Sequence, residues 1–330
     1  MKLAKGMFAL IVLVASGLRA DVTIRYQSEF KPSAALQPIM EQFMKTMQTA
    51  TNSSVIVQGN RAYTTTGNWT QIFDFAKGEM TLVDPAHKTF TTLPVAQFAD
   101  KMAGAMPQMS SQQMQGIGQA LASIKSNVDS KVTGKTAEIQ GVQAEEREVT
   151  LTMDFPLPPG MTQNGPAMKM VIHIWTAKNE EAMRVPAIRE LTGYQAWQRY
   201  IMNPAGVFEK VAGKMPGVSE IIGPLLTEMF KNQAVILRTH MEIYTPILAT
   251  LAKQMAAQGK QFPIAVDPDA PLMEINQEVA ELSSAPVDIT SFEIPKEYTS
   301  VPPEDMIRAM VKAQSAATAV AAPPAADAPK

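Results

Sequence analysis

The sequence predicts an α+β protein built on one curved, mostly antiparallel β-sheet, a half-barrel wrapped around helices. Closely spaced turn signals between short β-branched and aromatic runs indicate a meander, and several longer segments alternate between apolar and polar residues. Blocks with helical spacing lie between these segments. The chain has 330 residues, of which 46% are hydrophobic and 18% charged, so it can bury one large core.

A meander of five short strands is expected between residues 55 and 93. The turns between them are marked by Gly59-Asn60, Gly67-Asn68, Lys77-Gly78 and Asp84-Pro85. The runs between the turns are rich in Val, Ile, Thr and aromatic residues, which fit a half-buried strand. The expected strands cover residues 55–57, 62–66, 71–75, 80–83 and 88–92.

Further strands and helices of the same domain follow from periodicity. Alternation predicts strands at residues 22–30, 127–140, 142–155, 168–176, 234–244 and 272–282. Helical spacing predicts helices within residues 33–50, 95–125, 185–232 and 246–258. We therefore expect a single domain over residues 21–302, in which 95–125 and 185–232 are helical insertions.

Both ends of the chain are expected to lie outside this domain. Residues 1–20 have a basic start and an apolar run of about a dozen residues, which is typical of a signal peptide and too short to span a membrane. Cleavage is expected after Ala20, with Gly17 as the alternative, and an uncleaved anchor is the alternative interpretation. Residues 303–330 predict a short helix and a disordered Ala/Pro tail.

Export would give a periplasmic or secreted protein without an integral membrane anchor. The formal net charge is -2, and loss of the basic signal peptide would make the mature chain more acidic. An acidic chain is not expected to bind nucleic acid. The absence of cysteine excludes disulfides, thiol catalysis and cysteine metal sites.

The sequence offers no recognisable catalytic or metal-binding motif. His87, His173 and His240 show no HxH or HxxxH spacing, so they predict one surface histidine and two sheet residues, with no metal site and no cofactor. Asp74 and Asp84 are interpreted as turn residues. No nucleophile elbow or phosphate-binding glycine loop occurs, and we expect a protein that is not an enzyme. A hydrolase that uses unidentified carboxylates is the weakest alternative.

Local patterns resemble a known family. The run QIFDFAKGEMTLVDPAHKTFTT at residues 71–92 resembles hairpins of exported bacterial proteins related to the lipoprotein-carrier (LolA/LolB-type) half-barrel. The strand after Gly141, the MVIHIWTA strand and residues 278–298 are similar to parts of an uncharacterised exported family with that fold. The resemblance covers most of residues 22–298. It implies a curved sheet whose apolar concave space can hold acyl chains, and no lipid-contacting residue is carried over.

Methionine and tryptophan provide the candidate binding groove. Methionine side chains are flexible and polarisable, so a Met-rich helical segment can act as an adaptable lid over an apolar ligand. Plain core packing and Cu(I) binding through thioethers are the alternative interpretations. The candidate groove residues are Trp69, Met102, Met106, Met109, Met114, Met170 and Trp175.

The expected function is therefore non-catalytic. The protein would bind a hydrophobic ligand, such as a lipid or an acyl chain, or an envelope protein partner, on the concave face of the sheet. The alternative is a structural or interaction module whose interior is filled by its own helices and holds no small ligand.

Overall fold

The computed structural model describes most of the chain between residues 21 and 319. The predicted signal peptide, most of the helix expected at residues 33–50 and the end of the Ala/Pro tail lie outside the described residues. The described residues are 21–37, 52–105, 116, 118–119, 121–156, 165–202, 218–231, 234–260, 262 and 266–319.

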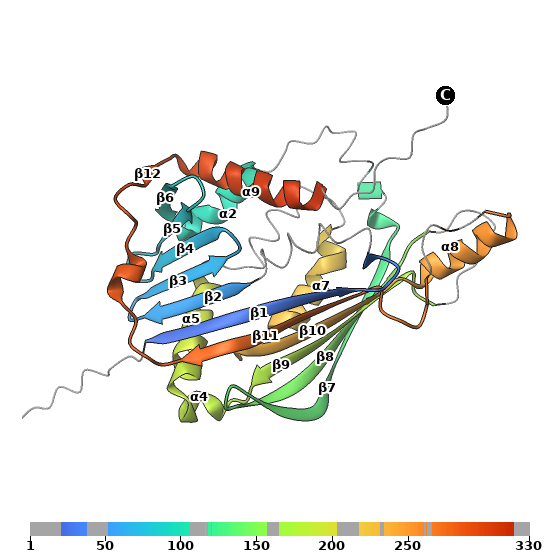
Figure 1. The fold of residues 1–330 in the computed structure, drawn as a ribbon, viewed down its shortest axis with the longest axis horizontal. Coiled ribbons are helices and arrows are strands. Elements are labelled where there is room, and N and C mark those ends of the chain that lie inside the picture. The colour runs from blue at the N-terminus through green and yellow to red at the C-terminus, as the bar shows by residue number, and fades with distance from the viewer. Residues whose placement is uncertain are drawn as a thin grey trace, which may run out of the picture.

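One sheet of twelve strands organises the fold, in the order β12-β6-β5-β4-β3-β2-β1-β11-β10-β9-β8-β7 (Figure 1). All neighbours are antiparallel except the two-residue pairing of β12 with β6, so the predicted mostly antiparallel α+β class is confirmed. The strands are β1 (Val22–Pro32), β2 (Ser53–Gln58), β3 (Arg61–Thr66), β4 (Trp69–Asp74), β5 (Glu79–Asp84), β6 (Thr89–Pro94), β7 (Lys125–Ile139), β8 (Val142–Asp154), β9 (Met168–Ala177), β10 (Ile236–Tyr244), β11 (Met273–Ser283) and β12 (Thr299–Ser300).

The N-terminal strand joins the two halves of the sheet. Strands β2 to β6 extend from one side of β1 as the predicted meander. The turn glycines Gly59, Gly67 and Gly78 have φ values of 56°, 57° and 66°, a conformation that residues with a Cβ rarely adopt. Strands β7 to β11 form a second meander that ends when β11 pairs with the other side of β1. Residues far apart in sequence therefore meet at the centre of the sheet.

Helices cover one face of this sheet. In Figure 1, α5 and α7 lie behind the strands, while α2 and α9 lie together beside β6. Helix α8 follows β10 and extends away from the sheet at one end. The expected insertions thus contain α2 in residues 95–125 and α5 and α7 in residues 185–232. The helices are α2 (Val95–Ala105), α4 (Glu181–Arg184), α5 (Pro186–Met202), α7 (Val218–Phe230), α8 (Pro246–Ala257) and α9 (Pro303–Ala319), with a 3₁₀ turn, η1, at Ile289–Phe292.

The main core lies between the sheet and helices α2, α5 and α9. Phe73 and Met80 from the meander are fully buried, and they belong to the same cluster as Ile188 of α5 and Ile307 of α9. Pro303 begins α9, as the sequence predicts, but the helix continues to Ala319. Its burial of Ile307 makes this C-terminal helix part of the main core.

A smaller core cluster lies under α7. Leu151 of β8, Ile172 of β9 and Leu225 of α7 belong to it. Arg147 of β8 is 6% exposed and donates hydrogen bonds to the backbone carbonyls of Glu228 and Met229, at the end of α7. A guanidinium group satisfies helix-end carbonyls that have no partner within the helix. Arg147 therefore fixes the end of α7 against the sheet.

Candidate functional site

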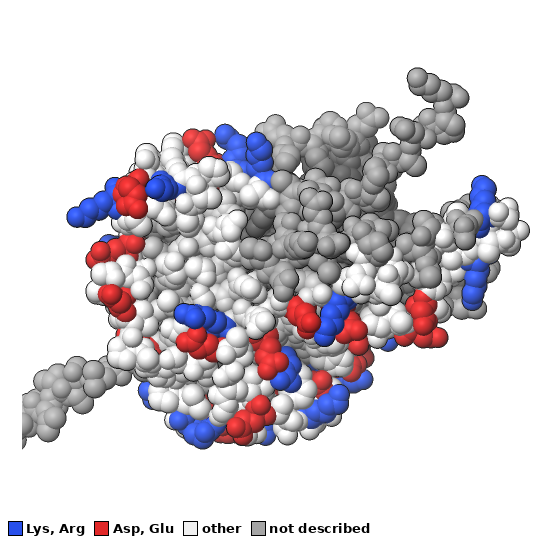
Figure 2. Space-filling view, in the orientation of Figure 1, with Lys and Arg blue, Asp and Glu red and all other residues white. Residues whose placement is uncertain are grey.

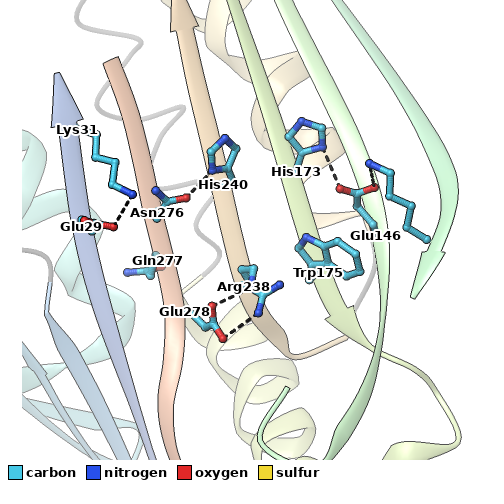
Figure 3. A pocket seen from close by; sticks show the side chains of 11 residues that line it. Glu29, Lys31, Glu146, His173, Trp175, Arg238, His240, Asn276, Gln277 and Glu278 are labelled. Carbon is cyan, nitrogen blue, oxygen red and sulfur yellow. Dashed lines mark hydrogen bonds and ion pairs between the residues drawn. The ribbon is translucent and has the colours of Figure 1, made fainter. Parts of the chain in front are cut away.

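Strands β8 to β11 and the end of β1 carry polar side chains on the face opposite α7. Side chains alternate along a strand, so Ile172 and Ile174 point into the core under α7 while His173 and Trp175 point to the other side. We call this second side the polar face, and Figure 3 shows most of its residues. The polar face consists of Glu29, Lys31, Glu146, Glu148, His173, Trp175, Arg238, His240, Glu242, Asn276 and Glu278.

Strand register brings the central residues of the polar face into one row. His173 of β9 lies opposite His240 of β10, and His240 lies opposite Asn276 of β11. Asn276 in turn lies opposite Glu29 of β1. The two imidazole rings have centroids 5.9 Å apart (Figure 3). Four strands thus contribute to one compact set of groups.

Glu146 anchors one end of this row. Its side chain is 3% exposed, and it accepts a 2.6 Å hydrogen bond from the Thr133 hydroxyl. The Lys135 ammonium lies 3.2 Å from the same carboxylate, and Nδ1 of His173 lies 3.0 Å from its other oxygen. Burial alone would raise the pKa of Glu146, but the Thr133 hydroxyl, Lys135 and His173 outweigh burial and lower it. Glu146 is therefore held as a carboxylate.

The contact between His173 and Glu146 has the distance of an ion pair but not the angles of a regular hydrogen bond. His173 Nδ1 is buried and has no other hydrogen-bond partner among the described residues. Because the distance is short and both atoms are buried, we treat Glu146 as the group that orients this ring. The Nδ1 atom of His240 is oriented by a hydrogen bond with Oδ1 of Asn276.

Glu242 lies beside both histidines. Its carboxylate oxygens are 3.9 Å from Nε2 of His173 and 3.4 Å from Nε2 of His240. Each ring therefore has Nδ1 directed to one acceptor and Nε2 directed towards the same carboxylate. Within the described ranges, however, no group of three or more His, Asp or Glu side chains is arranged so that it could hold a metal ion.

A pocket of about 510 Å³ opens over this row. Arg238 donates two hydrogen bonds, of 2.8 and 2.9 Å, to Glu278 and lies 5.8 Å from the centre of the Trp175 ring. Lys31 pairs with Glu29 at 3.0 Å. Figure 2 shows such neighbouring blue and red side chains over β1 and β11, whereas the surface over β2 to β5 is mostly white. The pocket is lined mostly by polar and charged residues, and its opposite charges lie in pairs.

The structure distributes the predicted groove residues among different places. Trp69 and Met102 pack against the main core. Trp175 also touches the main core but lines the polar pocket. Met170 packs under α7, on the opposite face of β9 from Trp175. The remaining candidates, Met106, Met109 and Met114, lie outside the described residues.

The sequence analysis placed each histidine in its own turn or strand, but it did not predict which histidines lie close together. His87 is exposed in the β5–β6 turn, where its Nδ1 lies 2.6 Å from the Asp84 carboxylate, as expected for a turn pair. His173 and His240 are sheet residues, but the sequence analysis missed that they face each other. No short spacing could have indicated this, because the contact depends on the pairing of two separate strands.

Comparisons with known proteins leave the family open. No family model matches the chain, and no curated protein matches it. Among solved structures, a chain described as "Structure of PNGF-II in C2 space group" is similar at a TM-score of 0.29 and 10% identity. The match covers 87% of this chain and 32% of that one, so this chain spans about a third of the longer protein. A likeness this weak carries no argument. No helix in the described part of the chain has the length and apolar character needed to cross a membrane.

Proposed function

We propose that this chain is an exported, non-catalytic binding protein with a half-barrel of the carrier type, whose interior is filled by its own side chains. Its binding site is the polar pocket on the opposite face of the sheet. The signal-peptide pattern supports export. The filled interior was the alternative interpretation of the sequence. The binding surface is now the polar face, whereas the sequence analysis expected the concave face.

The packing of α5 against the meander is the observation that carries the proposal. Phe75 packs at a tilt of 36° on Trp197 of α5 with ring centroids 4.0 Å apart, and Phe73 meets the same ring edge-on at 5.7 Å. Tyr194 lies 5.8 Å from Phe75, and its hydroxyl is 3.3 Å from that of Thr64. These aromatic contacts fill the space between the meander and α5, which supports an interior filled by the protein's own side chains.

The composition of the polar pocket supports a binding role without catalysis. Its lining contains carboxylates, imidazoles, amides, basic groups and Trp175, but no serine, threonine or cysteine nucleophile. Its acids and bases neutralise one another, as Arg238 and Glu278 do. Paired groups of this kind fix geometry and recognise a polar ligand, whereas a general acid or base needs a free site for its proton.

A hydrophobic ligand is the second candidate, at a different place. A mainly apolar pocket of about 430 Å³ lies at the end of the sheet near the start of α8. Among its lining residues, Ser33 and Thr245 have buried hydroxyl oxygens that find no hydrogen-bond partner within the described part of the chain. Such hydroxyls favour an apolar ligand that carries one hydrogen-bonding group. We call this the end pocket; it is lined by Ser33, Ala34, Ala35, Thr245, Val266, Asp267, Ala270, Pro271 and Leu272.

Mass spectrometry of an organic extract tests these alternatives. Purified residues 21–330 are extracted beside a control protein prepared identically. We expect no stoichiometric lipid, because the helix-covered face is filled. A stoichiometric acyl lipid that persists in an Ala35→Phe variant, whose new ring occupies the end pocket, would contradict the proposal. A lipid that is lost in this variant would belong to the end pocket and would support the second candidate.

A further inference from the structure

We infer that the outer edge of β7 is a dimerisation surface, which pairs antiparallel with the same edge of a second copy of this chain. Strand β7 has 15 residues and lies at one end of the sheet (Figure 1). Within the described part of the chain it pairs with β8 alone, so the backbone groups of its other edge have no strand partner. Long open edges readily accept a further strand. This surface is separate from the polar pocket, and the inference goes beyond the proposed function.

The two sides of this edge carry different side chains. Val132 is 71% exposed, and it is one of three exposed large hydrophobic side chains in the described structure. Val128 lies on the same side of β7 and packs beside the small core cluster under α7. Asp129 and Lys131 are exposed on the opposite side, which continues the polar face. The edge therefore offers an apolar contact on one side and both signs of charge on the other.

One antiparallel register makes this edge complementary to itself. When Ser130 lies opposite Ser130 of the second copy, each Val132 lies opposite Val128 of the other chain, and each Lys131 lies opposite Asp129. Each Val132 then adds to the small core cluster of the other copy. Even-numbered residues meet even-numbered residues in this register, so outward-directed backbone groups meet one another and the two sides of the sheet match.

Neighbouring registers are less complementary. A register centred on Lys131 places two lysines opposite each other, which is unfavourable. A register centred on Asn127 pairs Lys125 with Asp129 but leaves Val132 without an opposite residue in the strand. Exposed ion pairs add little affinity, so the charges select the register. The backbone hydrogen bonds and the valine contact supply the attraction.

An irregularity in β7 limits the size of this interface. The regular ladder ends between Val132 and Thr136, so regular pairing covers residues 128–132 of each chain. Bulges protect edges from pairing, and this one leaves only the first part of the strand open. Such a short contact predicts a weak dimer, with a Kd of roughly 10–100 μM. Since like sides of the sheet are continuous across the pair, both polar faces lie on one side of the dimer and can bind a multivalent ligand together.

Sedimentation equilibrium of residues 21–330, at concentrations up to about 300 μM, tests the inference. We expect a reversible equilibrium between monomer and dimer. Val132→Lys should weaken association at least tenfold, because a charge replaces the apolar contact with Val128. The control Ile289→Lys, at an exposed hydrophobic position outside β7, should associate as the wild type does. A wild type that stays monomeric over the whole range would overturn the inference, as would a dimer that Val132→Lys does not weaken.

A charge exchange tests the register. Asp129→Lys places a lysine opposite Lys131 in both copies and should weaken association, whereas the double variant Asp129→Lys/Lys131→Asp restores opposite charges and should recover affinity. Melting curves establish that each variant folds, since Lys131 also pairs with Glu148 at 2.8 Å. Hydrogen exchange of the wild type gives a readout without substitution, because amides of residues 128–132 should become slower as protein concentration rises. Concentration-dependent protection confined to other segments would assign the dimer to another surface and overturn the inference.

Discussion

Phe73→Ala is expected to lower the free energy of unfolding by about 3–5 kcal/mol. Phe73 is fully buried in the main core and meets the Trp197 ring edge-on at 5.7 Å. Removing its ring forfeits apolar burial and leaves a cavity that rigid strands and α5 cannot fully close. Urea denaturation of residues 21–330, analysed by linear extrapolation, measures the change.

Ile289→Ala serves as the control for this substitution. Ile289 is 60% exposed, so its truncation should change the free energy of unfolding by no more than about 0.5 kcal/mol. If Phe73 instead bordered an open ligand cavity, its ring would be less completely packed and its loss would cost less. A Phe73→Ala effect close to that of the control would count against a filled interior.

Glu146→Gln is expected to lower the free energy of unfolding by about 1–3 kcal/mol at neutral pH. The carboxylate is 3% exposed and interacts with Thr133, Lys135 and His173. An amide of the same shape loses the charge that holds Lys135 and His173. It also brings a donor group to a place where the present contacts need an acceptor. Urea denaturation compares the variant with the wild type.

The difference in unfolding free energy between wild type and Glu146→Gln should depend on pH, because the pKa of Glu146 is lowered. A carboxyl whose pKa is lower in the folded state stabilises the fold above its unfolded value, about 4.3 for glutamate, and this contribution is lost as pH falls through the folded pKa. The difference between wild type and Glu146→Gln should therefore be present at pH 7 and shrink below about pH 4. A difference as large at pH 3 as at pH 7 would exclude the carboxylate charge as its cause.

Glu148→Gln is the matched control on the same strand. Glu148 also lies on the polar face and pairs with a lysine, Lys131, but its side chain is 21% exposed, whereas that of Glu146 is 3% exposed. Ion pairs of this kind contribute little to stability, so we expect a change below about 1 kcal/mol. Equal losses of unfolding free energy in Glu146→Gln and Glu148→Gln would mean that the burial of Glu146 and its hydrogen bond from Thr133 add nothing to stability.

The meander could be predicted from the sequence because its signals are local. Glycines at Gly59, Gly67 and Gly78 take positive φ where the chain turns, and they end each strand close to the expected residue. Alternation then fixes which side of a strand is buried, as at Met80 and Leu82. The half of the fold with short turns and clear alternation is therefore determined by neighbours in sequence.

The polar site could not be predicted in the same way, because it depends on long-range register. The contact between His173 and His240 exists only once β9 pairs with β10. Thr133 and Lys135 both reach Glu146 because β7 has an irregularity between Val132 and Thr136. Gly134, with φ of 78°, lies within it and was the one local signal of this feature.

Methionine spacing could not decide between a groove and a core. An amphipathic helix has the same apolar stripe whether it lines a ligand groove or packs in a core, because the stripe indicates only that an apolar partner covers it. Met102 on α2 packs against the main core, together with sheet and helix residues that surround it. The identity of the covering partner is set by tertiary packing, which a single helix does not encode.

Xenon-pressurised crystals of residues 21–330 test the filled interior most directly. Xenon enters apolar cavities that exclude water, so it reports empty space independently of any natural ligand. We predict no xenon site between the sheet and helices α2, α5 and α9 in the wild type, and one at the missing ring in Phe73→Ala. A well-occupied xenon site beside Trp69 or Met102 in the wild type would contradict the account and restore the apolar carrier.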